Sequence, residues 1–438
     1  MSQQIRTDVL IVGAGPGGCA AALSLAKQGT KALLVDRTAF PRDKVCGDAL
    51  SGKVMRVLDR LAPDVGERLR ADARQQPSWG VTFTAPGGRS LRVPFGRYTG
   101  RGDAPGAIMP RLDFDALLVE KVRKAPGIEL IEGATVKDFE RTTSGWCVSD
   151  AAKRLTIHAR LVIAADGANS HFARHVAGLE LEPRHHCAGI RAYFENVQGL
   201  DPDGFIELIF LKELLPGYLW IFPLPGGRAN VGLGLRSDMV RDRRLDLKAM
   251  LRALLTEHPR LKERFKEATH TGGIQGLGLP LASRRRILSG DGYLLVGDAG
   301  HLIDPFTGEG ISHAMISGSH AGEVAAEALV RTRERPNRIF LGEYDVRVWR
   351  RLGKELSIST KLQRLAAFPW LFDLVVNRAA KNPVSPKLSA ACSTTWICAP
   401  GCEAPPSMRS CFSAKPFARP GGAARAAPAT SPSLLFPG

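Results

Sequence analysis

The chain has 438 residues, of which 44% are hydrophobic and 24% are charged, a globular composition in a chain longer than one core usually fills. A mean hydropathy of -0.08 and the lack of any long apolar run exclude a bundle of transmembrane helices. The formal charge of +17 favours anionic ligands such as phosphates or a lipid surface, although an ordinary Arg-rich surface would give the same value. No nucleic-acid-binding module is recognisable, so we expect no nucleic acid partner.

The first 36 residues predict a βαβ unit. Strands are expected at 8–12 and 31–36, with a helix at 19–28 between them. The turn after the first strand has the pattern GxGxxG, in which the first glycine permits a sharp turn, the second lets the backbone approach a pyrophosphate, and the last lets the helix pack on the strand. The residues expected to hold the dinucleotide here are Gly13, Gly15, Pro16, Gly17 and Gly18.

An acidic residue follows the second strand, as a ribose-binding carboxylate would. Asp36 stands 18 residues after Gly18. Arg37 comes next and could favour a 2′-phosphate instead, so this motif alone does not separate FAD from NAD.

The remaining pattern alternates between strands and helices. A loop at 40–52 precedes a helix at 53–61, and a further helix is predicted at 111–124. Helices are also predicted at 245–265, 311–330 and 341–377, the last interrupted at Pro369. Strands are predicted within 79–93, at 128–131, 135–140, 145–149, 154–159, 161–165 and 292–296, and throughout 187–235.

The strand at 292–296 leads into a second candidate cofactor motif, which reads GDAGH and then DPFTGEG. It resembles the second FAD motif of the para-hydroxybenzoate hydroxylase superfamily. The resemblance implies that Asp298, with Gly297, binds the ribityl or ribose hydroxyls. It also implies that Gly308, Gly310 and Ile311 face the isoalloxazine ring, where the dipole of the following helix favours electron density.

Two shorter motifs resemble the same superfamily. Asp166 lies in a DG turn, and Arg111 begins a helix with the pattern RxxFD, in which the arginine approaches the diphosphate. The order of the four motifs is more specific than any one of them.

Within that superfamily the chain resembles the geranylgeranyl reductase family over residues 5–382. A loop carries the pair Cys46 and Gly47, which the resemblance places beside flavin and substrate, and an aromatic YxWxFP strand precedes an NVGxG strand. The resemblance implies that Tyr218, Trp220, Phe222 and Pro305 contact a prenyl chain. The three aromatic residues share one strand face, so a purely structural core would explain them equally well.

The family resemblance implies an FAD-dependent oxidoreductase that reduces C=C bonds of a geranylgeranyl-type lipid or an isoprenoid quinone. Cys46 and His301 are the candidate catalytic residues, and no general acid is evident beyond His301. NAD(P)H or a ferredoxin could supply electrons. A monooxygenase or halogenase on the same fold is the alternative, although neither Lys44 nor Lys53 is identifiable as a halogenase lysine. A non-catalytic flavin-binding membrane-surface protein is a third hypothesis.

The expected fold is α/β, with a Rossmann-like FAD-binding domain of the para-hydroxybenzoate hydroxylase type, an inserted and mainly antiparallel β domain for the substrate, and C-terminal helices. The FAD-binding domain is assigned to residues 1–75, 105–185 and 285–335. The substrate domain is assigned to 76–104 and 186–284, and the helical segment to 336–382.

Residues 383–438 are rich in Pro, Ala, Ser and Gly, which predicts disorder or an altered reading frame. Cys398 and Cys402 lack the partners of a zinc site, so no metal is expected. The sparse cysteines indicate cytosolic thiols. We therefore expect a cytoplasmic protein and leave open a peripheral contact with the inner face of the membrane.

Overall fold

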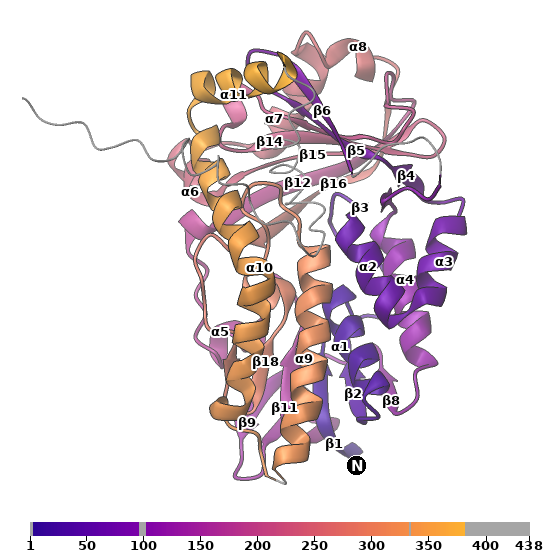
Figure 1. The fold of residues 1–438 in the computed structure, drawn as a ribbon, viewed down its shortest axis with the longest axis vertical. Helices are drawn as coiled ribbons and strands as arrows, with labels where there is room; N and C mark the ends of the chain where they lie inside the picture. The colour runs from indigo at the N-terminus through magenta and orange to yellow at the C-terminus, as the bar shows by residue number, and fades with distance from the viewer. Residues whose placement is uncertain (1–2, 96–101, 333, 382–438) are drawn as a thin grey trace, which may run out of the picture. The chain divides into compact units, whose positions relative to one another are not determined.

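The computed structural model describes residues 3–95, 102–332 and 334–381. The expectations for 383–438, including those for Cys398 and Cys402, lie outside these residues. Two large sheets and one small sheet organise the described chain, and long helices pack beside them (Figure 1).

The first large sheet contains β1 (Gln3–Val12), β2 (Ala32–Val35), β8 (Ile128–Ile131), β9 (Val136–Arg141), β10 (Trp146–Asp150), β11 (Leu155–Ala164), β17 (Ser289–Gly290) and β18 (Tyr293–Leu295). Its order is β17-β18-β11-β1-β2-β8, and β1 pairs in parallel with both β2 and β11. The carboxyl ends of β1, β2 and β18 therefore reach one edge of the sheet, where ligands of parallel sheets bind.

The two strands predicted at 154–159 and 161–165 are a single strand, β11. Its first half alternates between buried and partly exposed residues beside the antiparallel β10, and its second half is buried throughout between β1 and β18. This change of environment within one strand made the sequence pattern look interrupted.

Four helices support this sheet: α1 (Pro16–Lys27), α4 (Arg111–Arg123), α9 (Ile311–Arg331) and α10 (Arg338–Ala366). α1 packs closely along α9, and α10 lies on the other side of α9 (Figure 1). The approach of α1 to α9 needs glycine, because a Cβ on Gly318 would lie 2.1 Å from the carbonyl oxygen of Gly17.

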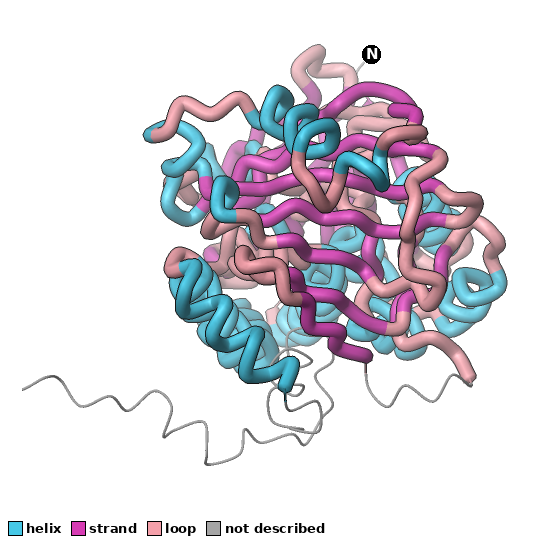
Figure 2. The backbone as a smooth tube through the Cα atoms, turned by 90° about the horizontal axis from the view of Figure 1, so that it is seen from above, coloured by secondary structure: helices cyan, strands magenta, loops and turns pink. Residues whose placement is uncertain are grey.

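The second large sheet contains β5 (Gly80–Thr84), β6 (Ser90–Pro94), β12 (His186–Glu195), β13 (Ile206–Ile209), β14 (Tyr218–Leu224), β15 (Arg228–Arg236) and β16 (Thr269–Pro280). Its order is β16-β12-β15-β14-β13-β5-β6, and Figure 2 shows these strands side by side. All neighbours are antiparallel except β5 and β13. The predicted fold class, with its mainly antiparallel β part, is confirmed.

The single helix predicted at 245–265 is wrong. The chain forms α6 (Ser237–Asp242), α7 (Leu247–Glu257) and α8 (Lys262–Phe265). α7 ends because His258 precedes Pro259 and is extended, with a ψ of 126°, as residues before proline prefer.

The remaining elements lie around the loop at 40–52 and at the C-terminal end of the described chain. A small sheet joins β3 (Ala49–Leu50), β4 (Gln76–Ser78) and β7 (Gly106–Ile108), next to α2 (Gly52–Leu61) and α3 (Pro63–Ala71). A short α5 (His171–His175) follows β11, and α11 (Pro369–Lys381) lies beside β6. Among the residues that the structure describes, each helix is too short or too polar to cross a bilayer.

The packing of α1 on α9 predicts a large difference between two helical glycines. Gly318→Ala should destabilise the fold by about 1–3 kcal/mol or more, because the new methyl group meets backbone that cannot move aside. Gly342→Ala is the control, because a Cβ there meets nothing within 4 Å and alanine favours a helix by about 0.5–1 kcal/mol. Denaturant unfolding measures both, and equal stability of the two variants would contradict the packing argument.

Candidate functional site

The glycine-rich turn has the geometry that the sequence predicts. Gly13 has a φ of 101°, and a Cβ there would lie 2.4 Å from the carbonyl oxygen of Ala165. A Cβ on Gly18 would lie 1.8 Å from the carbonyl oxygen of Gly13. Gly15 differs, because its Cβ would enter open space, with its nearest neighbour the Arg42 guanidinium at 3.8 Å. Two glycines thus close the turn, and the third leaves its backbone accessible at the start of α1.

Asp36 lies at the end of β2 beside this turn and is buried. Its carboxylate accepts hydrogen bonds from the backbone N–H of Ala14 at 2.7 Å and of Thr38 at 2.9 Å, and from the Thr38 hydroxyl at 2.7 Å. Asp36 therefore fixes the glycine turn, and its carboxylate oxygens retain capacity for another donor.

A buried arginine faces the same turn from α4. The Arg111 guanidinium donates two hydrogen bonds to Asp115, both at 2.7 Å, and Arg42 lies 2.9 Å from the same carboxylate. Burial alone would lower the pKa of Arg111, but Asp115 and the nearby Cys46 raise it, so Arg111 stays charged. Two arginines share one carboxylate here, and the positive charge that remains suits a diphosphate.

Asp298 approaches from the turn after β18, the 3₁₀ element η3 (Gly297–Gly300), and pairs with Lys44 at 3.1 Å. The positive φ of Gly297, 58°, and its closeness to Ala314 bring this turn against α9. Asp166 lies opposite, at the end of β11. Its Oδ1 is buried and has no hydrogen-bond partner, and burial raises the pKa of Asp166. The site thus offers an unused acceptor at the position where a ligand hydroxyl would donate.

Three neighbouring cavities connect these groups. The first, of about 1360 Å³, extends from Asp36 and Arg37 past Gly13 to Arg111. The second, of about 590 Å³, shares Gly15 and Arg111 with the first and adds Pro16, Gly17 and Asp298. The third, of about 680 Å³, shares Cys46, Gly308, Gly310 and Ile311 with the second. A dinucleotide bound along this series would have its diphosphate beside the start of α1.

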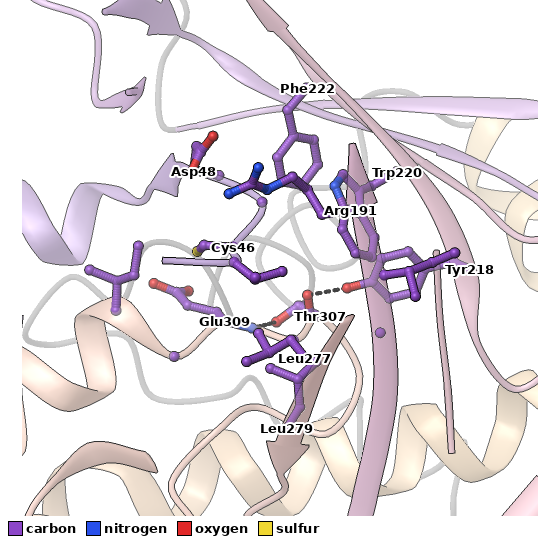
Figure 3. Close-up of a pocket in the computed structure, with 18 residues that line it drawn as sticks. Cys46, Asp48, Arg191, Tyr218, Trp220, Phe222, Leu277, Leu279, Thr307 and Glu309 are labelled. Carbon is purple, nitrogen blue, oxygen red and sulfur yellow. Dashed lines mark hydrogen bonds between the residues drawn. The ribbon is translucent and has the colours of Figure 1, made fainter. Parts of the chain in front are cut away.

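The third cavity has an aromatic wall (Figure 3). Tyr218, Trp220 and Phe222 line it from alternate positions of β14. Trp220 donates to the Asn230 side chain at 2.9 Å, and the Tyr218 hydroxyl donates to the carbonyl of Thr307. Leu277 and Leu279 of β16, in the same sheet, also line this cavity.

Glycines make room for these rings. A Cβ on Gly232 of β15 would lie 2.3 Å from Trp220, and a Cβ on Gly47 would lie 2.7 Å from Phe222. Gly232 of the NVGxG strand and Gly47 of the Cys-Gly pair therefore leave the space that the rings of Trp220 and Phe222 occupy.

Cys46 lines both the second and the third cavity. The Asn230 side chain donates to its carbonyl oxygen at 2.8 Å, and this bond ties the loop at 40–52 to the second sheet. The structure therefore places Cys46 and Gly47 between the cofactor motifs and the aromatic wall.

His301 and Pro305 do not line these cavities. His301 is buried, and burial together with Arg286 and His186 lowers its pKa to about 4, so its imidazole is neutral near neutral pH. Pro305 is held by a hydrogen bond from Gln363 to its carbonyl at 2.7 Å. Neither residue is among those that line the three cavities described above.

Two buried carboxyl groups of the third cavity were missed by the sequence reasoning. Asp48 has a φ of 69° and accepts hydrogen bonds from the Tyr193 hydroxyl at 2.6 Å and from Asn230 at 2.7 Å, while burial raises its pKa to about 6. Glu309 lines the cavity from the loop before α9. Glu309 stands inside the TGEG motif, so its position could have been noted, whereas nothing in the sequence joins Asp48 to Tyr193.

Comparison with known proteins agrees with this geometry. The family model "FAD binding domain" matches residues 6–203. A menaquinone reductase of Mycobacterium tuberculosis is 30% identical, over 84% of this chain and 86% of that protein. A digeranylgeranylglycerophospholipid reductase of Methanopyrus kandleri is 32% identical, over 82% and 86%.

The fold also matches a crystal structure, that of a geranylgeranyl bacteriochlorophyll reductase-like protein of Thermoplasma acidophilum. The TM-score is 0.75 and the identity 24%, over 90% of this chain and 97% of that one.

The open space at Gly15 yields a prediction about FAD. Gly15→Ala should leave the unfolding of the flavin-free protein nearly unchanged but weaken FAD binding at least about tenfold, because the methyl group occupies the space expected for the diphosphate. Gly273→Ala in β16, where a Cβ also meets open space, is the matched control. Flavin fluorescence titration measures both affinities. Unaltered binding by the Gly15 variant would mean that the diphosphate lies elsewhere.

Proposed function

The chain belongs to the geranylgeranyl reductase family of FAD-dependent oxidoreductases, and from this premise we propose that it reduces carbon–carbon double bonds of a prenyl lipid or an isoprenoid quinone. The observation that carries the proposal is the aromatic and aliphatic cavity beside the second FAD motif. Reduced FAD supplies a hydride to such a bond when it is bound. Residues of the chain hold the cofactor, orient the substrate and exclude water.

The charged groups of the first two cavities would hold the cofactor. Arg111, Arg42 and the start of α1 face the expected diphosphate, and Asp36 and Asp298 can accept bonds from sugar hydroxyls. Gly308 and Gly310 line the second and third cavities alike, so the flavin ring would lie at that junction.

The aromatic wall would orient the substrate. A prenyl chain carries no hydrogen-bonding groups, so apolar contact and exclusion of water are what a site can offer it. Tyr218 and Trp220 both satisfy their polar atoms within the protein and can present apolar ring surface to the cavity. The relatives include a reductase of a phospholipid and one of menaquinone. Both substrate classes are accordingly candidates.

We propose that the domains assigned from the sequence have different functions. Residues 1–75, 105–185 and 285–335 would bind FAD with the first sheet, and residues 76–104 and 186–284 would bind substrate with the second. Residues 336–382 would brace the loop that joins the second FAD motif to α9, as the bond from Gln363 to Pro305 illustrates.

We further propose that the end of α10 and α11 form a peripheral membrane contact. Trp370 and Leu374 are exposed on one face of α11, and Phe368 is exposed just before it. The opposite face packs inward, where the Phe372 ring lies 4.6 Å from that of Phe210. Exposed basic residues nearby are Lys361, Arg364 and Arg378. An apolar face with basic neighbours suits an anionic lipid surface.

The reductase proposal predicts turnover without oxygen. Protein reduced anaerobically with dithionite should convert digeranylgeranylglycerophospholipid, whose isolated double bonds dithionite does not itself reduce, into products heavier by pairs of hydrogen atoms, as mass spectrometry measures. Gly15→Ala, with weakened FAD binding, is the matched control. Hydroxylated or halogenated products that form only with oxygen would instead support the monooxygenase or halogenase alternative. FAD binding without turnover on any prenyl lipid would support the non-catalytic one.

The membrane proposal predicts a loss of vesicle binding. The full chain should co-sediment with vesicles that contain anionic phospholipid, and the triple change Phe368→Ser, Trp370→Ser and Leu374→Ser should reduce the bound fraction several-fold. Val330→Ser, at a more exposed apolar residue on α9, is the control. If both variants sediment like the unaltered protein, another surface contacts the lipid.

A further inference from the structure

A group of buried ionisable side chains lies directly behind the third cavity. Glu309 lines the cavity itself, Lys53 comes from α2, Glu355 from α10 and His313 from α9. Each of the four is at most 6% exposed. No residue expected from the sequence as catalytic belongs to this group, so its function needs a separate explanation.

The four side chains form one continuous path. The Nζ of Lys53 lies 3.4 Å from Oε2 of Glu309 and donates a hydrogen bond to Oε1 of Glu355. The Nε2 of His313 lies 3.4 Å from the same oxygen of Glu355. The Ser51 hydroxyl donates to Oε1 of Glu309 and completes the surroundings of that carboxyl group.

The hydrogen bonds also determine the state of His313. Its Nδ1 lies 2.7 Å from the carbonyl oxygen of Leu302, which can only accept, so Nδ1 carries a proton. Nε2 then faces the Glu355 carboxylate and is favourably protonated as well. Burial alone would lower the pKa of His313, but Glu355 and Glu309 raise it. Burial alone would raise the pKa of Glu355, but Lys53 and His313 lower it.

Charge balance leaves this group with one movable proton. With Lys53 and His313 charged and both glutamates ionised, the net charge is zero, and burial strongly favours such neutrality. Moving one proton from His313 to Glu309, by way of Glu355 and Lys53, keeps the net charge at zero. Asp304 is a further carboxyl group beside these four side chains, and burial raises its pKa. Its Oδ1 accepts hydrogen bonds from the Ser359 hydroxyl and from the N–H groups of Phe306 and Thr307.

We propose that Glu309 is the proton donor of the proposed reduction and that Glu355, Lys53 and His313 supply it. In Figure 3 the Glu309 side chain lies next to Cys46 at the edge of the cavity. Among the other polar residues of this cavity, Tyr218 donates to Thr307, Arg191 pairs with Asp43 at 2.8 Å, and both oxygens of Asp48 accept hydrogen bonds. Glu309 is the acidic residue of this cavity whose carboxyl group lies beside Lys53, which can pass a proton to it.

The step balances, and it rests on the proposed function. A hydride with its electron pair, supplied by the reduced cofactor, forms a C–H bond at one alkene carbon. The π pair takes the proton of the Glu309 carboxyl group at the other carbon, and the O–H bond breaks. The carboxylate that remains recovers a proton through Lys53 and Glu355 from His313, which then takes one from solvent. A two-electron donor, such as dithionite in the experiment, reduces the cofactor again.

The first test is single-turnover reduction of digeranylgeranylglycerophospholipid by dithionite-reduced protein. Glu309→Gln should bind FAD with unaltered affinity but reduce the lipid at least about 100-fold more slowly, the usual size of a general-acid contribution. Glu327→Gln, at a surface glutamate that pairs with Arg347, is the control and should keep the full rate. For the unaltered protein the rate should fall as pH rises above the ordinary imidazole range, because the group then loses its movable proton.

One further measurement separates a chemical function of Glu309 from a structural one. Formate should partly restore turnover to Glu309→Ala, because a small acid can enter the space that the side chain vacates, whereas a merely structural role predicts no rescue. A Glu309→Gln variant that reduces the lipid at the full rate would overturn the proposal.

An NMR measurement tests the proposal without turnover. The His313 imidazole of the flavin-free protein should lose its proton at a lower pH in Glu309→Gln and at an unchanged pH in Glu327→Gln, because Glu309 is one of the groups that raise the pKa of His313. If the titration of His313 is the same in Glu309→Gln, the two side chains are not coupled and the proposal fails. If the titration shifts as expected but no prenyl lipid is reduced by any form, the proposed function fails while the coupling between the two side chains remains.

Discussion

The contact of backbone with backbone between α1 and α9 is the constraint on which the site depends. Each helix begins at a cofactor motif, α1 at the glycine turn and α9 after the TGEG loop. Because Gly17 and Gly318 let the two helices approach without side chains between them, both helix starts reach the same row of cavities. The parallel pairing of β1 with β11, and of β11 with β18, holds Asp166 and Asp298 at the same edge. Two motifs almost 300 residues apart thus become one site.

The loop at 40–52 joins the cofactor motifs to the aromatic cavity. Arg42 bonds to Asp115 of α4, Lys44 to Asp298, and the carbonyl of Cys46 accepts from Asn230 of the second sheet. These contacts come from three different parts of the chain, so the loop position depends on both large sheets. The loop and β14 both line the apolar cavity, and Cys46 of the loop lines the second and third cavities alike.

Much of this arrangement could be predicted from the sequence because its signals are local. The glycine turn, Asp36 and the aromatic strand each follow from spacing within a few residues, and their elements appear within a few residues of the predicted bounds. The prediction of one helix at 245–265 was wrong because it followed the apolar periodicity and gave too little weight to Pro259, before which α7 ends. His301 was chosen for its closeness in sequence to Asp298, but its left-handed φ of 54° belongs to a buried turn, where its imidazole lines none of the three cavities described above.

The buried charges could not be predicted for a different reason. Lys53, Glu309 and Glu355 come from three separate segments, and each would pass in sequence for an ordinary surface residue of a helix or loop. Their burial is tolerable only as a set, because an isolated charge at such a place would be neutralised or excluded. Burial strengthens every interaction between these charges, and the loss of one member would leave the others without a partner. If the proposed function holds, the aromatic wall would contact a substrate without polar atoms, and the buried ionic group beside it would supply the proton that such a substrate cannot.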